Sequence, residues 1–157
     1  MNVRSKSLAR TSGQVIAAFG RHFSVEIQCG DIISCVMRGK KGGVACGDQV
    51  AIQLTTAGQG VIEIIQPRTS LLYRSDAFKE KIIAANVTQV IIVVAAIPSF
   101  SEELINRCLV AAESANISVL IVLNKADLVE PTQAAMKTLS IYQDLGHPVL
   151  QLSALGD

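Results

Sequence analysis

The sequence predicts an α/β protein with an all-β domain at its N-terminus, because the apolar periodicity changes halfway along the chain. Residues 13–65 contain five short strand-like runs separated by glycine-containing turns, with no apolar pattern of helix length. After residue 88 the pattern becomes strand, helix, strand, helix, strand, which is typical of a parallel sheet with right-handed crossovers. These two patterns predict two domains, residues 1–67 and residues 68–157.

The five runs of the first half predict a small closed barrel. Five strands with no helix between them fit an OB fold, and an SH3-like barrel stays open as an alternative because periodicity does not separate the two. Glycines between the runs supply the turns. The predicted strands are residues 13–20, 23–28, 32–37, 48–54 and 60–65.

The second half alternates apolar runs with amphipathic segments. The run "VIIVVAAI" at 90–97 is far shorter than the roughly 20 residues of a membrane span and is typical of a strand buried on both faces. Ser99 and Glu102 have the spacing of a capping box, and Pro131 and Gly146 are typical of a helix start and end. The predicted elements are a strand at 88–96, a helix near 101–115, a strand at 118–123, a helix between Pro131 and Gly146, and a strand from His147.

Composition and charge narrow the classes of function. The N-terminus has no apolar stretch that would make a signal peptide, so we expect a cytoplasmic protein. The four cysteines lack C-x-x-C spacing and nearby paired histidines, so we expect free thiols and no metal site in this chain. Residues 1–74 carry a net charge of +5 and residues 75–157 a net charge of −4, which suggests that the first half faces an anionic polymer.

The loop "RGKK" in the basic half is the candidate contact with this anionic polymer. Arg38, Lys40 and Lys41 lie among glycines that let the loop fit its charges to phosphates, without reading sequence. A solvated basic turn is an equally good interpretation of these three residues. Phe19 and Phe23 are the candidates for base stacking on the barrel, and both also fit a place in the core.

The stretch "VLIVLNKADL" places polar side chains at the exit of a buried strand. Ligands of open parallel sheets bind beyond the carboxyl ends of the strands, where Asn124, Lys125 and Asp127 fall. A carboxylate such as Asp127 can accept two parallel hydrogen bonds from the N1–H and N2–H₂ groups of guanine, a pair that adenine lacks. The later "LSALGD" could bring backbone N–H groups of Ser153 and Ala154 beside the same base. The alternative is that these residues form only a polar strand-to-helix loop.

With these motifs the sequence resembles the circularly permuted GTPases that depend on the small ribosomal subunit. N-K-x-D followed by S-A is the guanine-recognition pair of P-loop GTPases, and in the permuted family a five-stranded barrel precedes it. The resemblance runs from about residue 11 to the last residue, and "AANVTQV" and "NKADL" are its most specific parts. No G-x-x-x-x-G-K-[ST] phosphate loop occurs in the 157 residues.

The resemblance implies a GTP-binding and GTP-hydrolysing factor of late small-subunit maturation, whose barrel contacts ribosomal RNA. It implies GTP or GDP with Mg²⁺ as ligands, the small ribosomal subunit as partner and no membrane. The family continues into a phosphate loop, switch regions and a zinc-binding domain. We therefore expect this chain to be the N-terminal portion, to hold no catalytic residues and to be inactive alone. The competing function is a non-enzymatic RNA-binding or scaffold module with a structural N-K-A-D loop.

Overall fold

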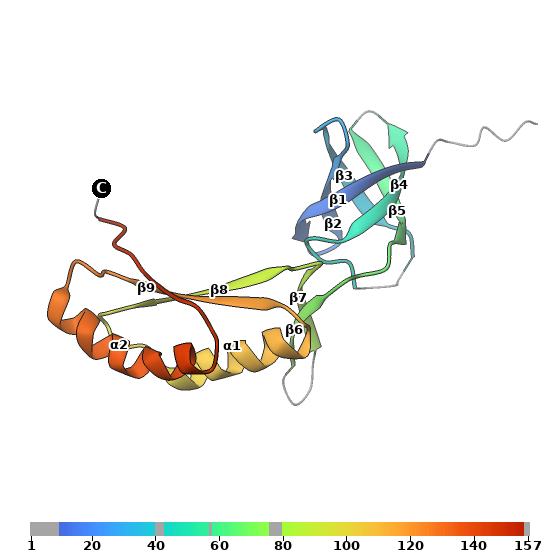
Figure 1. The fold of residues 1–157 in the computed structure, drawn as a ribbon. Coiled ribbons are helices and arrows are strands. Elements are labelled where there is room, and N and C mark those ends of the chain that lie inside the picture. Colours follow the sequence, from blue (N-terminus) through green and yellow to red (C-terminus); the bar gives the residue numbers. More distant parts are fainter. Residues whose placement is uncertain (1–9, 40–42, 57, 76–79, 156–157) are drawn as a thin grey trace, which may run out of the picture. The chain divides into compact units, whose positions relative to one another are not determined.

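The computed structural model describes residues 10–39, 43–56, 58–75 and 80–155 (Figure 1). The chain divides into two compact units, Met1–Val87 and Thr88–Asp157. The unit boundary lies 20 residues beyond the domain boundary predicted after residue 67, because a hairpin between the two positions packs with the barrel. The predicted domain limits stay a prediction.

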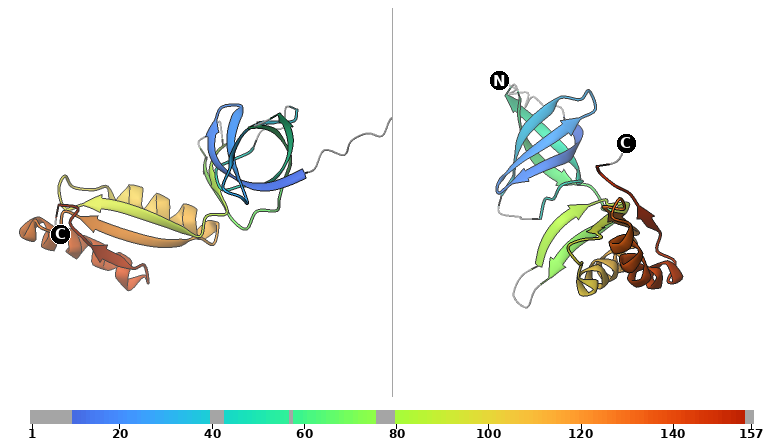
Figure 2. Two further views of the ribbon diagram at one scale, coloured as in Figure 1. Left: turned by 90° about the horizontal axis from the view of Figure 1, so that it is seen from above. Right: turned by 90° about the vertical axis from the view of Figure 1, so that its left-hand side faces the viewer.

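Five strands close into a barrel that is seen end-on in Figure 2. Their order around the barrel is β1-β2-β3-β5-β4, with β4 paired back to β1. Only β3 and β5 run parallel; the other neighbours in the barrel are antiparallel. This is the OB-like arrangement, so the structure decides between the two barrels that periodicity left open. The strands are β1 (Arg10–Phe19), β2 (His22–Ile27), β3 (Ile32–Met37), β4 (Gln49–Thr56) and β5 (Gln59–Ile65).

Alternate residues of these strands fill the barrel with mainly aliphatic side chains. Val15, Val25 and Ile52 are fully buried there, and Phe23 joins them. Cys35 also lies in this core, and burial raises the pKa of its thiol to about 11. All four cysteines are free.

A second pair of strands follows the barrel, β6 (Leu71–Ser75) and β7 (Glu80–Ala85), which form an antiparallel hairpin. The sequence predicted no strands in this segment. The hairpin is joined to the barrel, because the amide of Ala85 donates to the carbonyl of Cys46 at 2.8 Å.

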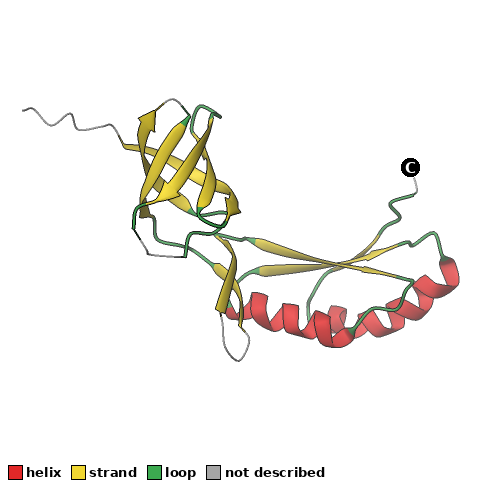
Figure 3. Ribbon diagram, turned by 180° about the vertical axis from the view of Figure 1, so that it is seen from behind, coloured by secondary structure: helices red, strands yellow, loops and turns green. Residues whose placement is uncertain are grey.

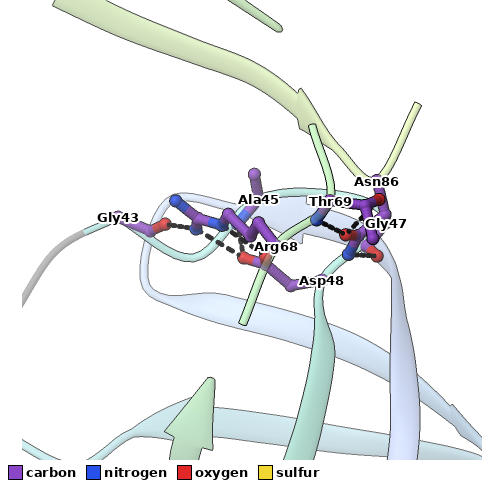
Figure 4. A network of polar contacts seen from close by, with 7 residues as sticks. All are labelled: Gly43, Ala45, Gly47, Asp48, Arg68, Thr69 and Asn86. Atoms are coloured by element: carbon purple, nitrogen blue, oxygen red, sulfur yellow. Dashed lines mark hydrogen bonds and ion pairs between the residues drawn. The ribbon is translucent and has the colours of Figure 1, made fainter. Parts of the chain in front are cut away.

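A buried ion pair lies beside this junction (Figure 4). The carboxylate of Asp48 is fully buried and accepts from Nε and Nη2 of Arg68, at 2.7 and 2.8 Å, and from the amide of Ala45 at 2.8 Å. Arg68 also donates to the carbonyl of Gly43. The hydrogen bond with Asp48 raises the pKa of Arg68, against the lowering effect of burial. The guanidinium therefore fixes residues 43–48 against the segment that leaves β5.

Gly47 completes the junction, and no other residue fits there. Its φ is +89°, and a Cβ at this position would lie 2.0 Å from the carbonyl oxygen of Ala85. The side-chain amide of Asn86 donates to the carbonyl of Gly47 at 2.9 Å and accepts from the amide of Thr69 at 2.9 Å (Figure 4). The end of the hairpin is thus bonded to the barrel by backbone and side chain.

The second unit is a three-stranded parallel sheet in the order β10-β9-β8. Since both crossovers run in the same direction, both helices lie on one side of the sheet (Figure 3). The core between them contains Ile92, Ile121 and Leu123 from the strands, with Leu109 and Leu139 from the helices. The elements are β8 (Gln89–Ala95), α1 (Glu102–Ser114), β9 (Ser118–Asn124), α2 (Val129–Asp144) and β10 (Val149–Gln151).

The elements of this unit confirm the predicted strand–helix order. Strand β8 is not buried on both faces as predicted, because Ile91 and Val93 are exposed on the face away from the helices. Two helix starts also differ from the prediction. The N-cap of α1 is Ser101, whose side chain accepts from the amide of Leu104 at 3.3 Å. Assigning this role to Ser99 was wrong, because Ser99 lies two residues farther from the first helical residue. Helix α2 begins at Val129, two residues before Pro131, and Gly146 follows its end with φ +90° as predicted.

Candidate guanine-binding site and barrel surface

The candidate base-binding loop begins where the buried strand β9 ends. Asn124 is the last residue of β9, and Lys125 has a φ of +67°, so the chain turns out of the sheet at once. Two hydrogen bonds hold this turn: Lys125 N–H donates to Oδ1 of Asn124 at 2.8 Å, and Leu128 N–H donates to the carbonyl of Lys125 at 3.0 Å. Asp127 is exposed on this loop, just before α2 begins.

Parallel pairing of β10 with β9 brings the second motif to the same place. Leu152 N–H donates to the carbonyl of Leu123 at 3.0 Å, which extends the pairing past the end of β10. The amide of Ala154 then donates to Oδ1 of Asn124 at 3.1 Å. Asn124 therefore holds its own loop and the later one together, although the two are separated by 30 residues.

Ser153 fixes the carboxylate of Asp127. Its hydroxyl donates to Oδ1 of Asp127 at 2.6 Å, and its oxygen accepts from the amide of Leu155 at 3.3 Å. Each carboxylate oxygen can accept two hydrogen bonds. Oδ1 can therefore accept one more besides the bond from Ser153, and Oδ2 can accept two. The carboxylate is oriented by Ser153 and still able to accept a pair of N–H groups.

The side chain of Lys125 crosses from this loop to the end of the neighbouring strand. Its Nζ donates to the carbonyl of Ile97 at 2.9 Å, which ties the ammonium group to the segment after β8. The extended aliphatic stem between these two points is the kind of surface that covers one face of a planar base.

The five predicted site residues are thus brought together at the carboxyl ends of β9 and β10. For Ala154 we expected a backbone N–H directed at the base, and in the structure this amide donates to Asn124. Donation from this amide to a base stays a prediction. Among the described residues there is no group of three or more His, Cys, Asp or Glu side chains that could hold a metal ion. None of the described helices is long and apolar enough to cross a membrane.

Of the three candidate RNA-binding residues of the barrel, Arg38 lies among the described residues. Arg38 directly follows β3, and its Nη1 donates to Oε1 of Glu63 at 2.8 Å. Lys40 and Lys41 lie outside the described residues. The basic loop therefore begins with an arginine that is already paired with a carboxylate.

Sequence reasoning left open which phenylalanine is accessible, and the structure separates the two. Phe23 is 8% exposed in the core, whereas Phe19 is 70% exposed at the turn between β1 and β2. Arg21 and His22 beside it are also exposed. The sequence feature that could have separated them is Gly20, which follows Phe19 directly. Gly20 has a φ of +64° in the turn, so Phe19 lies at the tip of the β1–β2 hairpin.

Comparison with known proteins gives the family. A family model described as RsgA GTPase matches residues 65–157. The chain is 61% identical over 145 residues to the small ribosomal subunit biogenesis GTPase RsgA of Nitrosospira multiformis, covering 92% of this chain and 46% of that protein. The protein of the same name from Nitrosomonas europaea is 54% identical over 154 residues, covering 96% and 49%. The chain spans about half the length of these relatives.

Two solved structures share the fold across both units. The crystal structure of YjeQ from Thermotoga maritima matches with a TM-score of 0.71 and 30% identity, covering 93% of this chain and 52% of that one. YloQ, described as a circularly permuted GTPase, matches with a TM-score of 0.68 and 25% identity, covering 96% and 54%. With a family model over more than half of its length and these relatives, the chain belongs to the RsgA GTPase family.

Proposed function

We propose that this chain supplies guanine recognition and RNA contact to a GTP-hydrolysing factor that acts late in maturation of the small ribosomal subunit, in the cytoplasm. Family membership supports the GTPase activity, and the names of the relatives support the ribosomal role. The observation that carries the proposal is the meeting of the N-K-A-D loop and the S-A loop, with Asp127 exposed and oriented by Ser153.

In this proposal Asp127 accepts N1–H and N2–H₂ of guanine, and Lys125 covers the base. A site that pairs such donors rejects a base that lacks them, because its own acceptor is then left unpaired. Adenine presents an acceptor at N1 and no amino group at C2, so Asp127 faces no donor there. Hydrolysis of GTP also needs groups that position and neutralise the phosphates, with Mg²⁺ among them. We assign none of these groups to the described residues.

The first prediction is selective binding of guanine. Titration of the chain with GDP should shift the NMR signals of the Lys125, Asp127 and Ala154 amides, whereas ADP at the same concentration should not. NMR titration measures weak binding as well as strong binding. The control is Asp144→Asn, which removes a carboxylate from the opposite end of α2 and should leave the GDP shifts unchanged. Equal shifts with GDP and ADP would refute guanine recognition.

The competing function is a non-enzymatic RNA-binding or scaffold module. It is favoured by the hydrogen bonds inside the loop, since Asn124, Lys125 and Asp127 all have partners within the protein. This function predicts no shift of these amides with either nucleotide. The same titration therefore separates the two functions.

For the barrel we propose contact with ribosomal RNA through the basic residues Arg38, Lys40 and Lys41, with Phe19 available to stack on an unpaired base. The net charge of the first half and the exposure of Phe19 support this. Charge contacts to phosphates give affinity that falls with salt, and stacking adds affinity that tolerates any base.

The second prediction concerns the contribution of these charges to RNA affinity. Replacing Arg38, Lys40 and Lys41 by Ala should weaken binding to purified small subunits. It should also flatten the slope of log affinity against log salt by about 0.7–0.9 per lost phosphate contact. The measurement is affinity at a series of salt concentrations, with Lys137→Ala as a control that removes one exposed charge from α2. If the slope of the triple variant matches that of the wild type, the loop is a solvated turn.

A further inference from the structure

One nearly buried carboxylate on the barrel holds two exposed arginines. Oε2 of Glu63 accepts from Nε of Arg10 at 3.0 Å, and Oε1 accepts from Nη1 of Arg38 at 2.8 Å. The side chain of Glu63 is 11% exposed, against 64% for Arg10 and 74% for Arg38. The anion is thus enclosed while both cations face solvent.

The three residues come from different strands whose pairing makes them neighbours. Arg10 opens β1 and pairs with Gln53 of β4, and Gln53 pairs with Val61 of β5, two residues before Glu63. Arg38 follows β3 directly, and its amide donates to the carbonyl of Ile62 at 3.2 Å. The arginines therefore approach Glu63 from its two sides, and closure of the barrel is what brings them together.

The cluster of Arg10, Arg38 and Glu63 is better suited to binding an anion than to stabilising the barrel. Ion pairs whose cation is exposed to water contribute only about 0–1 kcal/mol, and both arginines here are largely exposed. The cluster keeps a net charge of +1, and each arginine uses only one nitrogen on Glu63, so further N–H donors remain on both guanidiniums. Two guanidiniums held on the two oxygens of one carboxylate are suited to the several oxygens of one phosphate.

We propose that Glu63 is a positioning residue that holds Arg10 and Arg38 as a two-arginine site for one phosphate of the RNA backbone. The inference rests on the proposed contact of the barrel with RNA and adds the residues that make it. Both arginines are long and mobile side chains, and ordering such a side chain on binding has an entropic cost. The hydrogen bonds to Glu63 order both arginine side chains already in the free protein, so less entropy is lost when RNA binds.

The third prediction follows, and it has the opposite sign to the effect of net charge. Glu63→Gln leaves one acceptor oxygen and turns an N–H₂ group toward the other arginine. It should therefore weaken binding of the full chain to purified small subunits by roughly two- to tenfold, the factor for ordering one freed side chain. The matched control is Glu26→Gln on β2, which pairs with Ile32 at the far end of β3 from Arg38. It makes the same charge change and should leave affinity equal or raised.

A double variant separates a positioning role from a structural one. In the background Arg10→Ala/Arg38→Ala, which should itself bind more weakly, Glu63→Gln should weaken binding no further. If Glu63→Gln strengthens binding as Glu26→Gln does while Arg10→Ala/Arg38→Ala weakens it, positioning is overturned and the RNA contact stands. If Arg10→Ala/Arg38→Ala keeps wild-type affinity and salt slope, the arginine site is overturned, and RNA contact by the barrel then rests on the basic-loop experiment alone. Circular dichroism of each variant confirms that the barrel is folded.

Discussion

Arg68→Met should lower the free energy of unfolding of the first unit by about 3 kcal/mol. The substitution leaves the carboxylate of Asp48, which is fully buried, with the amide of Ala45 as its remaining donor among the bonds described. Breaking a buried ion pair by removing one partner costs about 3–5 kcal/mol, since the other charge stays desolvated. The lower end applies because the Arg68 side chain is 22% exposed. The substitution should also loosen the junction with the hairpin, because Arg68 donates to the carbonyl of Gly43 there.

Hydrogen exchange is the suitable measurement, because the chain has two compact units and exchange of core amides reports the unit that contains them. The slowest amides of the barrel, such as those of Val15 and Ile52, should exchange roughly a hundredfold faster in Arg68→Met. The control Arg21→Met removes an exposed arginine of the β1–β2 turn and should change exchange little. Unchanged exchange of the core amides in Arg68→Met would show that the ion pair is not needed for stability.

The barrel and the parallel sheet could be predicted because their signals are local. Each barrel strand has its own apolar run and its own turn, and β8 and β9 are almost wholly apolar. The hairpin β6–β7 has no such signal. Arg74 and Lys81 pair with each other across it, and the sequence between its two strands contains no glycine. Its place is fixed by bonds to Cys46 and Gly47 of the barrel, which no pattern within residues 71–85 encodes.

The candidate base site was predictable for a different reason, which is topology. Parallel neighbouring strands end at the same edge of a sheet, so residues after β9 and β10 must meet. What topology does not give is the partner of each polar atom. The bond from Ser153 to Asp127 and the bond from Ala154 to Asn124 depend on the exact paths of two loops.

Charge counting likewise found the basic half and missed how its charges are paired. Arg10 and Glu63 are 53 residues apart, Arg38 and Glu63 are 25 apart, and Arg68 and Asp48 are 20 apart. Each pair forms only once strands that are distant in the sequence pair with each other. A net charge computed over residues 1–74 sums Arg68 and Asp48 to zero and does not show that the two are paired at a buried carboxylate.

Asp127→Asn should reverse the preference of the base site from guanine to xanthine. Xanthine carries a carbonyl where guanine has N2–H₂, so an amide donor at residue 127 matches xanthine as the carboxylate matches guanine. Each polar group left unpaired against the wrong base costs about 1–3 kcal/mol, which corresponds to roughly five- to 150-fold in affinity. Ser153 can still donate to the amide oxygen of Asn, so the loop should keep its shape. Competition binding of the two nucleoside triphosphates measures the preference.

The ratio of the dissociation constants for GTP and xanthosine triphosphate tests guanine recognition by Asp127 most directly. We expect a ratio that favours GTP in the wild-type chain, favours xanthosine triphosphate in Asp127→Asn, and stays at the wild-type value in the control Asp144→Asn. A folded Asp127→Asn variant that still prefers GTP would rule out guanine recognition by Asp127, because the acceptor for the guanine donors would then lie elsewhere.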